Sequence, residues 1–270
     1  MSPALVEILQ PVDVVGLPIR PFDLHGLVEA IVARAQQRIT TLGCYSNAHT
    51  VNLACSDPEY GRVLRKCDLL YADGASIAWA GRLAGISIPG RITAMDYFPV
   101  LASRCAQEGL SMFLLGSKPG IIDTAAQNLR AEFPNLRIAG FHHGHFDLTD
   151  SSRILAEINA AQADILAVGM SSPRQEFWLR EHRETIQAPV RWCVGALFDY
   201  LGGGERRAPA WLCRMGGEWL FRLAMDPSGK WRRYLLGNPR FLWNTLRWLL
   251  VRRQGLGAAP NLESMGGLHE

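Results

Sequence analysis

Residues 39–74 read ITTLGCYSNAHTVNLACSDPEYGRVLRKCDLLYADG, and this stretch decides the fold. An apolar run over 39–47 is followed by a helical pattern over 49–66 and a second apolar run over 68–73. A strand, a helix of more than ten residues and another strand form a βαβ unit, whose two strands lie parallel in a covered sheet. The stretch therefore predicts an α/β protein.

The same alternation continues in both directions. We predict further strands over 14–17, 111–116, 136–141, 164–170 and 191–198. The helical patterns fall at 23–37, 75–83, 94–108, 120–133, 151–162 and 173–186. There is no internal repeat. The expected architecture is a Rossmann-like, mostly parallel sheet covered by helices.

The pattern changes near residue 201. Gly202-Gly203-Gly204 interrupts the alternation, and residues 205–253 then carry eleven Arg or Lys against three acids, a local charge of +8. Five of the eight tryptophans fall there, at 211, 219, 231, 243 and 248. We expect an α/β body over 1–201, a basic, Trp-rich helical appendage over 202–254 and a disordered tail over 255–270.

Composition excludes several classes of protein. The chain has 270 residues, of which 48% are hydrophobic and 20% charged, so it is neither collagenous, coiled-coil nor disordered. No uncharged apolar run reaches the roughly 20 residues that cross a bilayer, since the closest, 241–251, contains Arg247. The six cysteines form no CxxC pair, and the first 20 residues show no signal pattern, so we expect a reduced, cytosolic location.

Polar or small residues follow the predicted strands, where open α/β sheets bind their ligands. They are Asn47, Asp73, Gly116-Ser117, His142, His143, His145, Ser171-Ser172 and Asp199. Caps and turns favour the same residue types at these positions, which is the alternative interpretation. Asp73 follows an apolar strand and precedes Gly74, as suits a partly desolvated general base, although an N-cap of the next helix fits equally.

Other motifs narrow the chemistry. Arg91 is a loop cation suited to a phosphate, and Gln175 and Glu176 lie in the first turn of a predicted helix. Neither GxGxxG at the first βα turn nor GxxxxGK[ST] occurs, which argues against a dehydrogenase or a P-loop enzyme. The three histidines suggest zinc, but neighbouring strand residues face opposite ways and no second ligand cluster is evident, so we expect no metal.

Arginines interleaved with Trp, Phe and Leu in the appendage suit a helix at an anionic membrane surface. An amphipathic helix packed on the body is the second interpretation, and both can hold together. Nucleic acid is a third, weaker one, because basic and aromatic mixtures also bind strands; we expect no nucleic-acid partner. Such a surface also suits self-association into a homo-oligomer.

Taken together in order, these motifs resemble the WecG/TagA/CpsF glycosyltransferases over residues 14–234. The landmarks are Asn47-Ala48, Ala72-Asp73-Gly74, Arg91 with Asp96, Leu115-Gly116 with Pro119-Gly120, Gly144-His145-Phe146, Pro173-Arg174-Gln175-Glu176, Val194-Gly195-Ala196 with Phe198-Asp199, Arg207-Ala208-Pro209 and Glu218-Trp219-Leu220-Phe221-Arg222. Each landmark alone is weak, and the ordered set is specific.

The resemblance implies an inverting, metal-independent transfer of a hexose or N-acetylhexosamine from a UDP-sugar to an undecaprenyl-diphosphate-linked sugar. It implies a peripheral enzyme at the cytoplasmic face of the bacterial inner membrane, in surface polysaccharide synthesis, with no cofactor. By matching position, Asp73 is the base, and Asn47, Arg91 and Gln175 line the substrate pocket. Arg222 and Arg232 close over the diphosphate, while His145, Asp199, Gly116 and Gly195 belong to the nucleotide site.

The sequence departs from the family pattern at three positions. Tyr45 stands where Thr is frequent, His145 where Tyr is common, and Gly229 where an arginine is usual, with Lys230 beside it. The identities of the donated sugar and of the acceptor sugar stay open. A non-catalytic nucleotide- or lipid-sensing module of the same fold is the alternative function.

Overall fold

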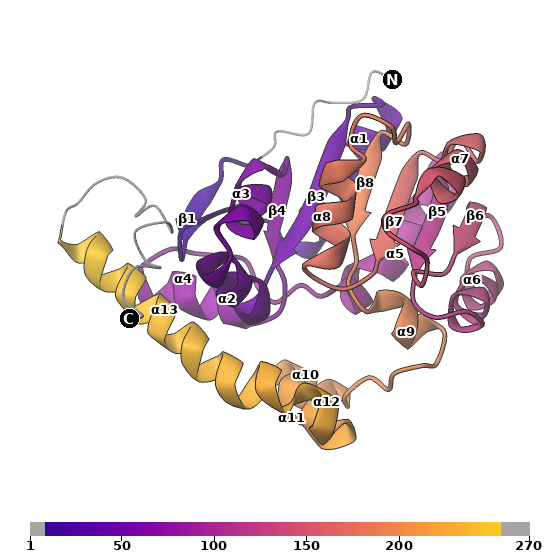
Figure 1. Cartoon of the computed structure of the whole chain (residues 1–270). Helices are drawn as coiled ribbons and strands as arrows, with labels where there is room; N and C mark the ends of the chain where they lie inside the picture. The colour runs from indigo at the N-terminus through magenta and orange to yellow at the C-terminus, as the bar shows by residue number, and fades with distance from the viewer. Residues whose placement is uncertain (1–8, 255–270) are drawn as a thin grey trace.

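The computed structural model describes residues 9–254, and of Arg214 only the backbone. Six parallel strands form one sheet in the order β4-β3-β8-β7-β5-β6. Their bounds are β3 Thr41–Ser46, β4 Leu69–Ala72, β5 Ser111–Gly116, β6 Arg137–His142, β7 Ile165–Gly169 and β8 Val190–Cys193. The predicted α/β, Rossmann-like class is confirmed (Figure 1).

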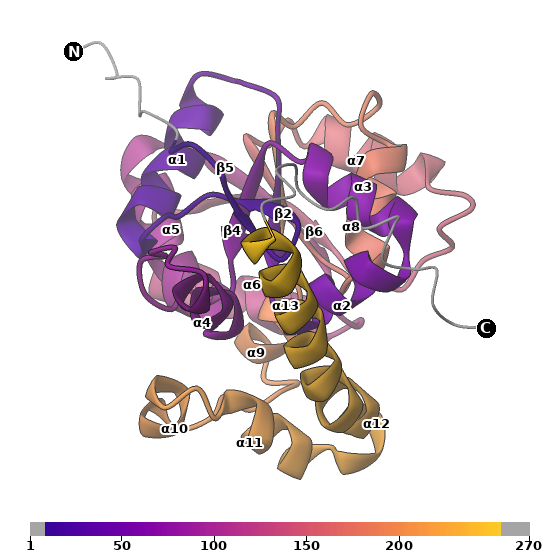
Figure 2. The same cartoon turned by 90° about the vertical axis from the view of Figure 1, so that its left-hand side faces the viewer.

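Helices cover both faces of this sheet, which explains why β5 and β7 are almost wholly apolar. α1 and α5 pack together on one face, and α2, α3 and α8 on the other (Figure 2). Their bounds are α1 Leu24–Gln36, α2 Ala48–Ser56, α3 Pro58–Lys66, α4 Ser76–Leu83, α5 Ala94–Glu108, α6 Ile121–Glu132, α7 Ser152–Ala160 and α8 Arg174–Glu181. Every residue of β4, β5, β7 and β8 is buried.

The N-terminal strand predicted over 14–17 is wrong. Instead of one strand, two short strands, β1 Val12–Val14 and β2 Leu17–Ile19, form an antiparallel hairpin. Residues 15–16 are its turn. Val15 and Gly16 have φ of 52° and 73°. Two positive φ angles match a tight turn to the right-handed twist of the flanking strands.

Three other predicted elements are too long. The helix over 49–66 is divided at Asp57, whose side chain caps α3, and Pro58 has no N–H to continue α2. The strand over 191–198 ends at Cys193, and 197–201 instead form α9 Leu197–Leu201. Of the helix over 173–186, only α8 is regular.

The appendage is helical, as predicted. It comprises α10 Ala210–Arg214, α11 Glu218–Met225, α12 Pro227–Trp231, the π-helical turn η1 Arg232–Leu236 and α13 Gly237–Arg253. Within the described residues, none of the helices has the length and apolar character to span a bilayer. The division at residue 201 stays a prediction, and the predicted tail over 255–270 lies outside the described residues.

Hydrogen bonds that are buried or partly buried dock α13 on the body. It packs along α2, where Asn244 Nδ2 donates to Asn52 Oδ1 at 3.0 Å and Asn52 Nδ2 donates to Gly237 O at 2.7 Å. Further along, Trp248 Nε1 donates to Asp13 Oδ1 at 2.7 Å. Buried polar groups are costly when unpaired, so these bonds favour a single docked position for α13.

Candidate active site

A cavity of about 500 Å³ lies between the carboxyl ends of β3, β4 and β8 and the appendage. α2 follows β3 on one face, whereas α9 follows β8 and packs against α5 and α6 on the other. Chains that leave neighbouring strands toward opposite faces open a crevice at the sheet edge. The body residues in its lining include Tyr45, Asn47, His49, Asp73, Trp79, Arg91, Ser172 and Gly195, and the appendage adds Glu218, Arg222, Arg233, Tyr234, Phe241 and Leu242.

Asn47 and Asp73 form the polar floor of this cavity. Ser46 and Ala72 are paired in register on the parallel strands β3 and β4, so the residues after them are neighbours. Asn47 Nδ2 donates to Asp73 Oδ2 at 2.9 Å. Asn47 Oδ1 meanwhile accepts from the backbone N–H groups of His49 and Thr50, which caps α2 and leaves the amide nitrogen facing Asp73.

The cap interpretation therefore holds for Asn47 and not for Asp73. The N-cap of α4 is Ala75, without a side-chain bond. Burial raises the pKa of Asp73 to about 6, the Asn47 hydrogen bond lowers it, and the carboxylate of Glu218 raises it. A half-buried carboxylate with a pKa near 6 is suited to accept a proton near neutral pH.

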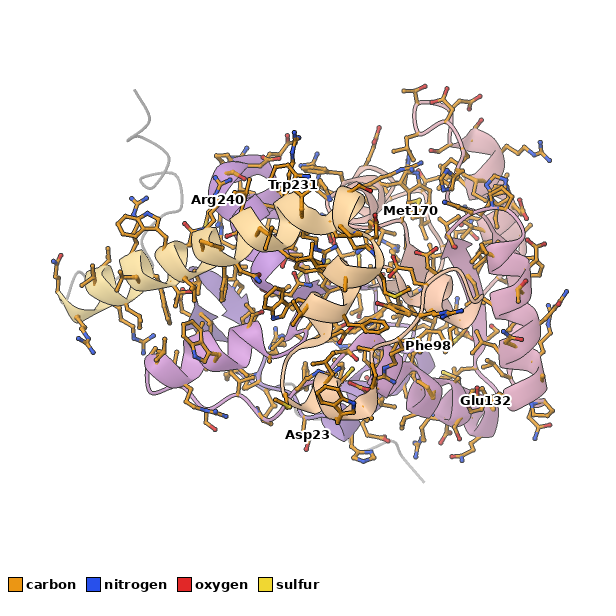
Figure 3. All side chains as sticks on the ribbon, turned by 90° about the horizontal axis from the view of Figure 1, so that it is seen from below. Asp23, Phe98, Glu132, Met170, Trp231 and Arg240 are labelled. Atoms are coloured by element: carbon orange, nitrogen blue, oxygen red, sulfur yellow. The ribbon has the colours of Figure 1, made fainter. Side chains whose placement is uncertain are left out.

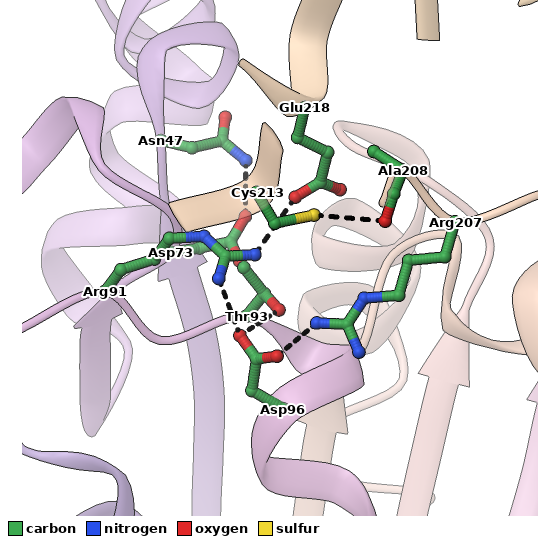
Figure 4. Close-up of polar contacts among 9 residues, drawn as sticks. All are labelled: Asn47, Asp73, Arg91, Thr93, Asp96, Arg207, Ala208, Cys213 and Glu218. Carbon is green, nitrogen blue, oxygen red and sulfur yellow. Dashed lines mark hydrogen bonds and ion pairs between the residues drawn. The ribbon is translucent and has the colours of Figure 1, made fainter. Parts of the chain in front are cut away.

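Arg91 lies between two carboxylates beside Asp73 (Figure 4). Its Nη1 is 3.2 Å from Asp96 Oδ2 and its Nη2 is 3.1 Å from Glu218 Oε2. Arg207 pairs with the other Asp96 oxygen, and Thr93 Oγ1 donates to Asp96 at 2.7 Å. The cluster joins α5 to the appendage and holds the Arg91 guanidinium at the cavity wall.

Two more arginines enter the cavity from the appendage. Arg222 Nη2 is 3.1 Å from Glu205 Oε2, and its guanidinium lies 5.3 Å from the centre of the Tyr200 ring. Arg233 faces the cavity with no carboxylate in ion-pair range among the residues described. Arg232 is exposed outside the cavity, with its guanidinium 5.3 Å from the Trp231 ring centre. The structure thus brings Arg222 and Arg233 to Asp73 and leaves Arg232 apart.

The predicted nucleotide residues are divided between two places. Gly195 lines the cavity, with φ of 61°, and a Cβ there would lie 2.8 Å from the Tyr45 hydroxyl. Asp199 accepts from Ser117 Oγ at 2.5 Å, near the ends of β5 and β8, outside the cavity lining. Gly116, at the end of β5, packs on Gly169, and His145 is exposed on the loop after β6.

Gln175 lies behind the cavity floor. It is fully buried; its Nε2 donates to Tyr45 Oη at 3.2 Å, and its Oε1 accepts from Gly195 N at 3.3 Å. Glu176 is buried beside it and accepts from Ser172 Oγ at 2.6 Å, and burial raises the pKa of its carboxyl to about 7. Both side chains face inward, so the first turn of α8 positions Tyr45 and Gly195 and offers no anion site.

Sequence reasoning missed several lining residues. Tyr45 drew notice only as a departure from a pattern, and nothing in the sequence singles out Trp79, Arg233 or Phe241 for this cavity. Among the described residues no group of three His, Cys, Asp or Glu side chains is arranged to hold a metal. The ring centres of His142 and His143 are 4.3 Å apart, and the ring planes are tilted by 43°.

The fold and this cavity define an α/β protein whose site combines a carboxylate of raised pKa, Asp73, with arginines suited to phosphate groups. Residues 12–255 match the Glycosyl transferase WecG/TagA/CpsF family, so the chain belongs to that family. Two relatives carry the name N-acetylglucosaminyldiphosphoundecaprenol N-acetyl-beta-D-mannosaminyltransferase. The relative from Bacillus spizizenii is 28% identical, over 72% of this chain and 74% of its own length. The relative from Bacillus subtilis is also 28% identical, over 78% of this chain and 81% of its own length.

Replacing Asn47 by Ala tests the floor pair. The lost donor leaves the Asp73 carboxylate less stabilised, so its pKa rises above about 6. The acid limb of kcat/KM for the proposed sugar transfer then moves to higher pH, because the base acts when deprotonated. A pH series of initial rates measures this shift.

Thr50→Ala is the matched control. Thr50 Oγ1 accepts from Asn47 N in the same capping box, and its bonds to Asn47 use only the backbone. Each variant weakens the cap, at a cost of about 1 kcal/mol, but only Asn47→Ala moves the acid limb. An equal shift in both variants contradicts the assigned role of Asn47.

Proposed function

We propose that this protein is an inverting glycosyltransferase. It moves a hexose or N-acetylhexosamine from a UDP-sugar to an undecaprenyl-diphosphate-linked sugar, without a metal, in surface polysaccharide synthesis. The observation that carries the proposal is the Asn47–Asp73 pair, a half-buried carboxylate with a raised pKa facing a cavity that three arginines enter. Family membership and the acceptor in the relatives' names support it.

The proposed reaction is a single displacement. The Asp73 carboxylate takes the proton of the acceptor hydroxyl as that oxygen forms a bond to the anomeric carbon of the donor. The bond from this carbon to the diphosphate oxygen breaks, and the electron pair leaves with UDP. One base and no nucleophile suffice, and one displacement inverts the anomeric centre.

Negative charge then develops on the departing diphosphate and must be stabilised. Among the side chains that the structure describes, Arg91, Arg222 and Arg233 are the arginines in the cavity lining. A guanidinium matches phosphate oxygens with two parallel N–H donors and keeps its charge at any working pH. These arginines are proposed to take the place that a divalent cation has in other transferases.

Release of UDP in detergent, with EDTA present, tests the proposal. A panel of UDP-sugars is combined with a lipid-diphosphate-linked sugar, and the wild type is compared with Asp73→Asn. We expect acceptor-dependent release by the wild type and a loss of at least about 1,000-fold in Asp73→Asn, since both base and charge are removed. UDP binding, measured by calorimetry, remains.

Near-normal turnover by Asp73→Asn contradicts the assignment of Asp73 as the base. The sensing module of the same fold predicts tight UDP binding and no release by the wild type with any donor. Against that alternative stands the Asn47 amide, directed at Asp73 by the α2 cap.

The two neighbouring arginines give a separate prediction. Removing a charged donor to phosphate costs about 1.5–3 kcal/mol, so Arg233→Ala lowers kcat/KM about 10- to 100-fold. Arg232→Ala, an exposed site outside the cavity, changes it about twofold at most. Steady-state rates with a short-tailed, water-soluble acceptor compare them without a membrane. A larger loss of kcat/KM in Arg232→Ala than in Arg233→Ala would instead assign the contact with the departing diphosphate to Arg232.

We also propose a peripheral location at the cytoplasmic face of the bacterial inner membrane. Figure 3 looks onto the side of the molecule that carries the appendage, where Trp231 and Arg240 lie. The exposed residues of the appendage include Trp211, Leu220, Met225, Trp231, Leu235, Leu236 and Trp243, together with Arg232, Arg240, Arg252 and Arg253. Rings at headgroup depth and cations facing anionic lipid suit this composition.

Flotation with vesicles checks the location. We expect binding to anionic vesicles that weakens with added salt, because each cation near the surface contributes about 1 kcal/mol. Leu236→Ser weakens it, whereas Ile39→Ser, an exposed apolar residue of the body, does not. Equal binding to vesicles without anionic lipid contradicts the role of the arginines.

A further inference from the structure

One wall of the cavity is apolar and leads away from Asp73. Trp79 on α4 and Phe241 and Leu242 on α13 line the same cavity as Asp73 and Arg233. The Trp79 and Phe241 ring centres are 6.5 Å apart, which places the two helices side by side here. Phe241 is buried, but Trp79 is 42% exposed and Leu242 51% exposed. The protein itself therefore leaves part of this wall uncovered.

The apolar surface continues outward along both helices. Leu83 follows Trp79 by four residues, and Leu246 and Leu250 follow Leu242 at the same interval, so each set lies on one helix face. All three leucines are about half exposed. We call Trp79, Leu83, Leu242, Leu246 and Leu250 the apolar track. Single exposed leucines are ordinary, but a row that begins inside a cavity with charged residues favours a ligand that is partly apolar.

We infer that the apolar track binds the first isoprene units of the acceptor's hydrocarbon tail, an inference that rests on the proposed function. A polyprenyl diphosphate joins a dianionic group directly to a branched, unsaturated hydrocarbon. The cavity offers cationic and apolar groups side by side. Trp79, Phe241 and Leu242 line it together with the arginines that the proposed reaction sets against the departing UDP. The acceptor's diphosphate would lie beside that cationic region, and its hydrocarbon would follow the exposed leucines.

The track is separate from the surface proposed to meet the bilayer. Trp243, Leu235 and Leu236 are exposed on the appendage and do not line the cavity. Leu242 and Trp243 are adjacent on α13 and so point about 100° apart around the helix. The apolar track is continuous with the cavity that holds Asp73, which favours the acceptor's tail as its occupant. The experiment below distinguishes the tail from two alternatives, an acyl chain of the bilayer and a second copy of this protein.

Calorimetry in detergent-free buffer tests this site without a membrane. The two probes are ethyl diphosphate and farnesyl diphosphate, the latter below its aggregation concentration, and they differ only in the hydrocarbon. We expect the wild type to bind the farnesyl compound at least about tenfold more tightly. This preference falls below about threefold in Trp79→Ala and in Leu242→Ser, both exposed positions where folding tolerates change.

Trp243→Ala is the matched control, since it removes an exposed tryptophan from the same helix outside the cavity. It keeps the tenfold preference. Equal binding of the two probes by the wild type, or the same loss of preference in Trp243→Ala, overturns the site. Sedimentation at each titration end point measures self-association. A preference for the farnesyl compound that appears only in a dimer also overturns the proposed site.

The transfer assay keeps this inference distinct from the proposed function. Tail preference at the track without sugar transfer by the wild type rejects the proposed function and keeps the site. Sugar transfer by the wild type together with an unchanged preference in Trp79→Ala and Leu242→Ser rejects the site and keeps the function.

Discussion

The hydrogen bond from Asn47 Nδ2 to Asp73 Oδ2 is the contact on which the site depends. It requires two parallel strands in register, because only then do the residues after Ser46 and Ala72 meet. It also requires the start of α2, whose backbone N–H groups fix the amide oxygen and so direct the nitrogen. Sheet register, helix capping and the protonation of one carboxylate are therefore coupled through a single amide.

Two of the cavity arginines, Arg91 and Arg222, are held in place by ion pairs before any ligand arrives. Asp96 and Glu218 hold Arg91, and Glu205 holds Arg222. Such partly exposed ion pairs contribute little to the free energy of unfolding. Their effect is geometric, because a long side chain that is already oriented loses less entropy when it binds an anion, and preorganised charge stabilises a transition state best.

Site residues placed by strand ends could be predicted from the sequence, whereas those placed by the rotation of a helix could not. Asn47, Asp73 and Gly195 fall in the cavity because carboxyl ends of parallel strands share an edge. Arg233 and not Arg232 faces the cavity, although the two are adjacent in the turn η1, because neighbouring residues of a helix point in different directions and the sequence marks no face there. Gln175 faces inward on a short helix whose sequence marks no clear face, and the 15–16 turn needed positive φ angles at a valine, which composition does not signal.

Body and appendage differ in composition yet build one cavity. Arg222, Arg233 and Phe241 all lie after residue 201. Of the described residues before that point, Arg91 is the one arginine in the cavity lining, so without the appendage Asp73 would face a single arginine. The bonds between Asn52, Asn244 and Gly237 that dock α13 on α2 therefore also position the cationic and apolar walls. Because Asn47 caps α2, the helix against which α13 packs is the one whose first turn orients the amide that faces Asp73. The contacts that dock α13 and the amide that faces Asp73 thus belong to one continuous helix and its cap.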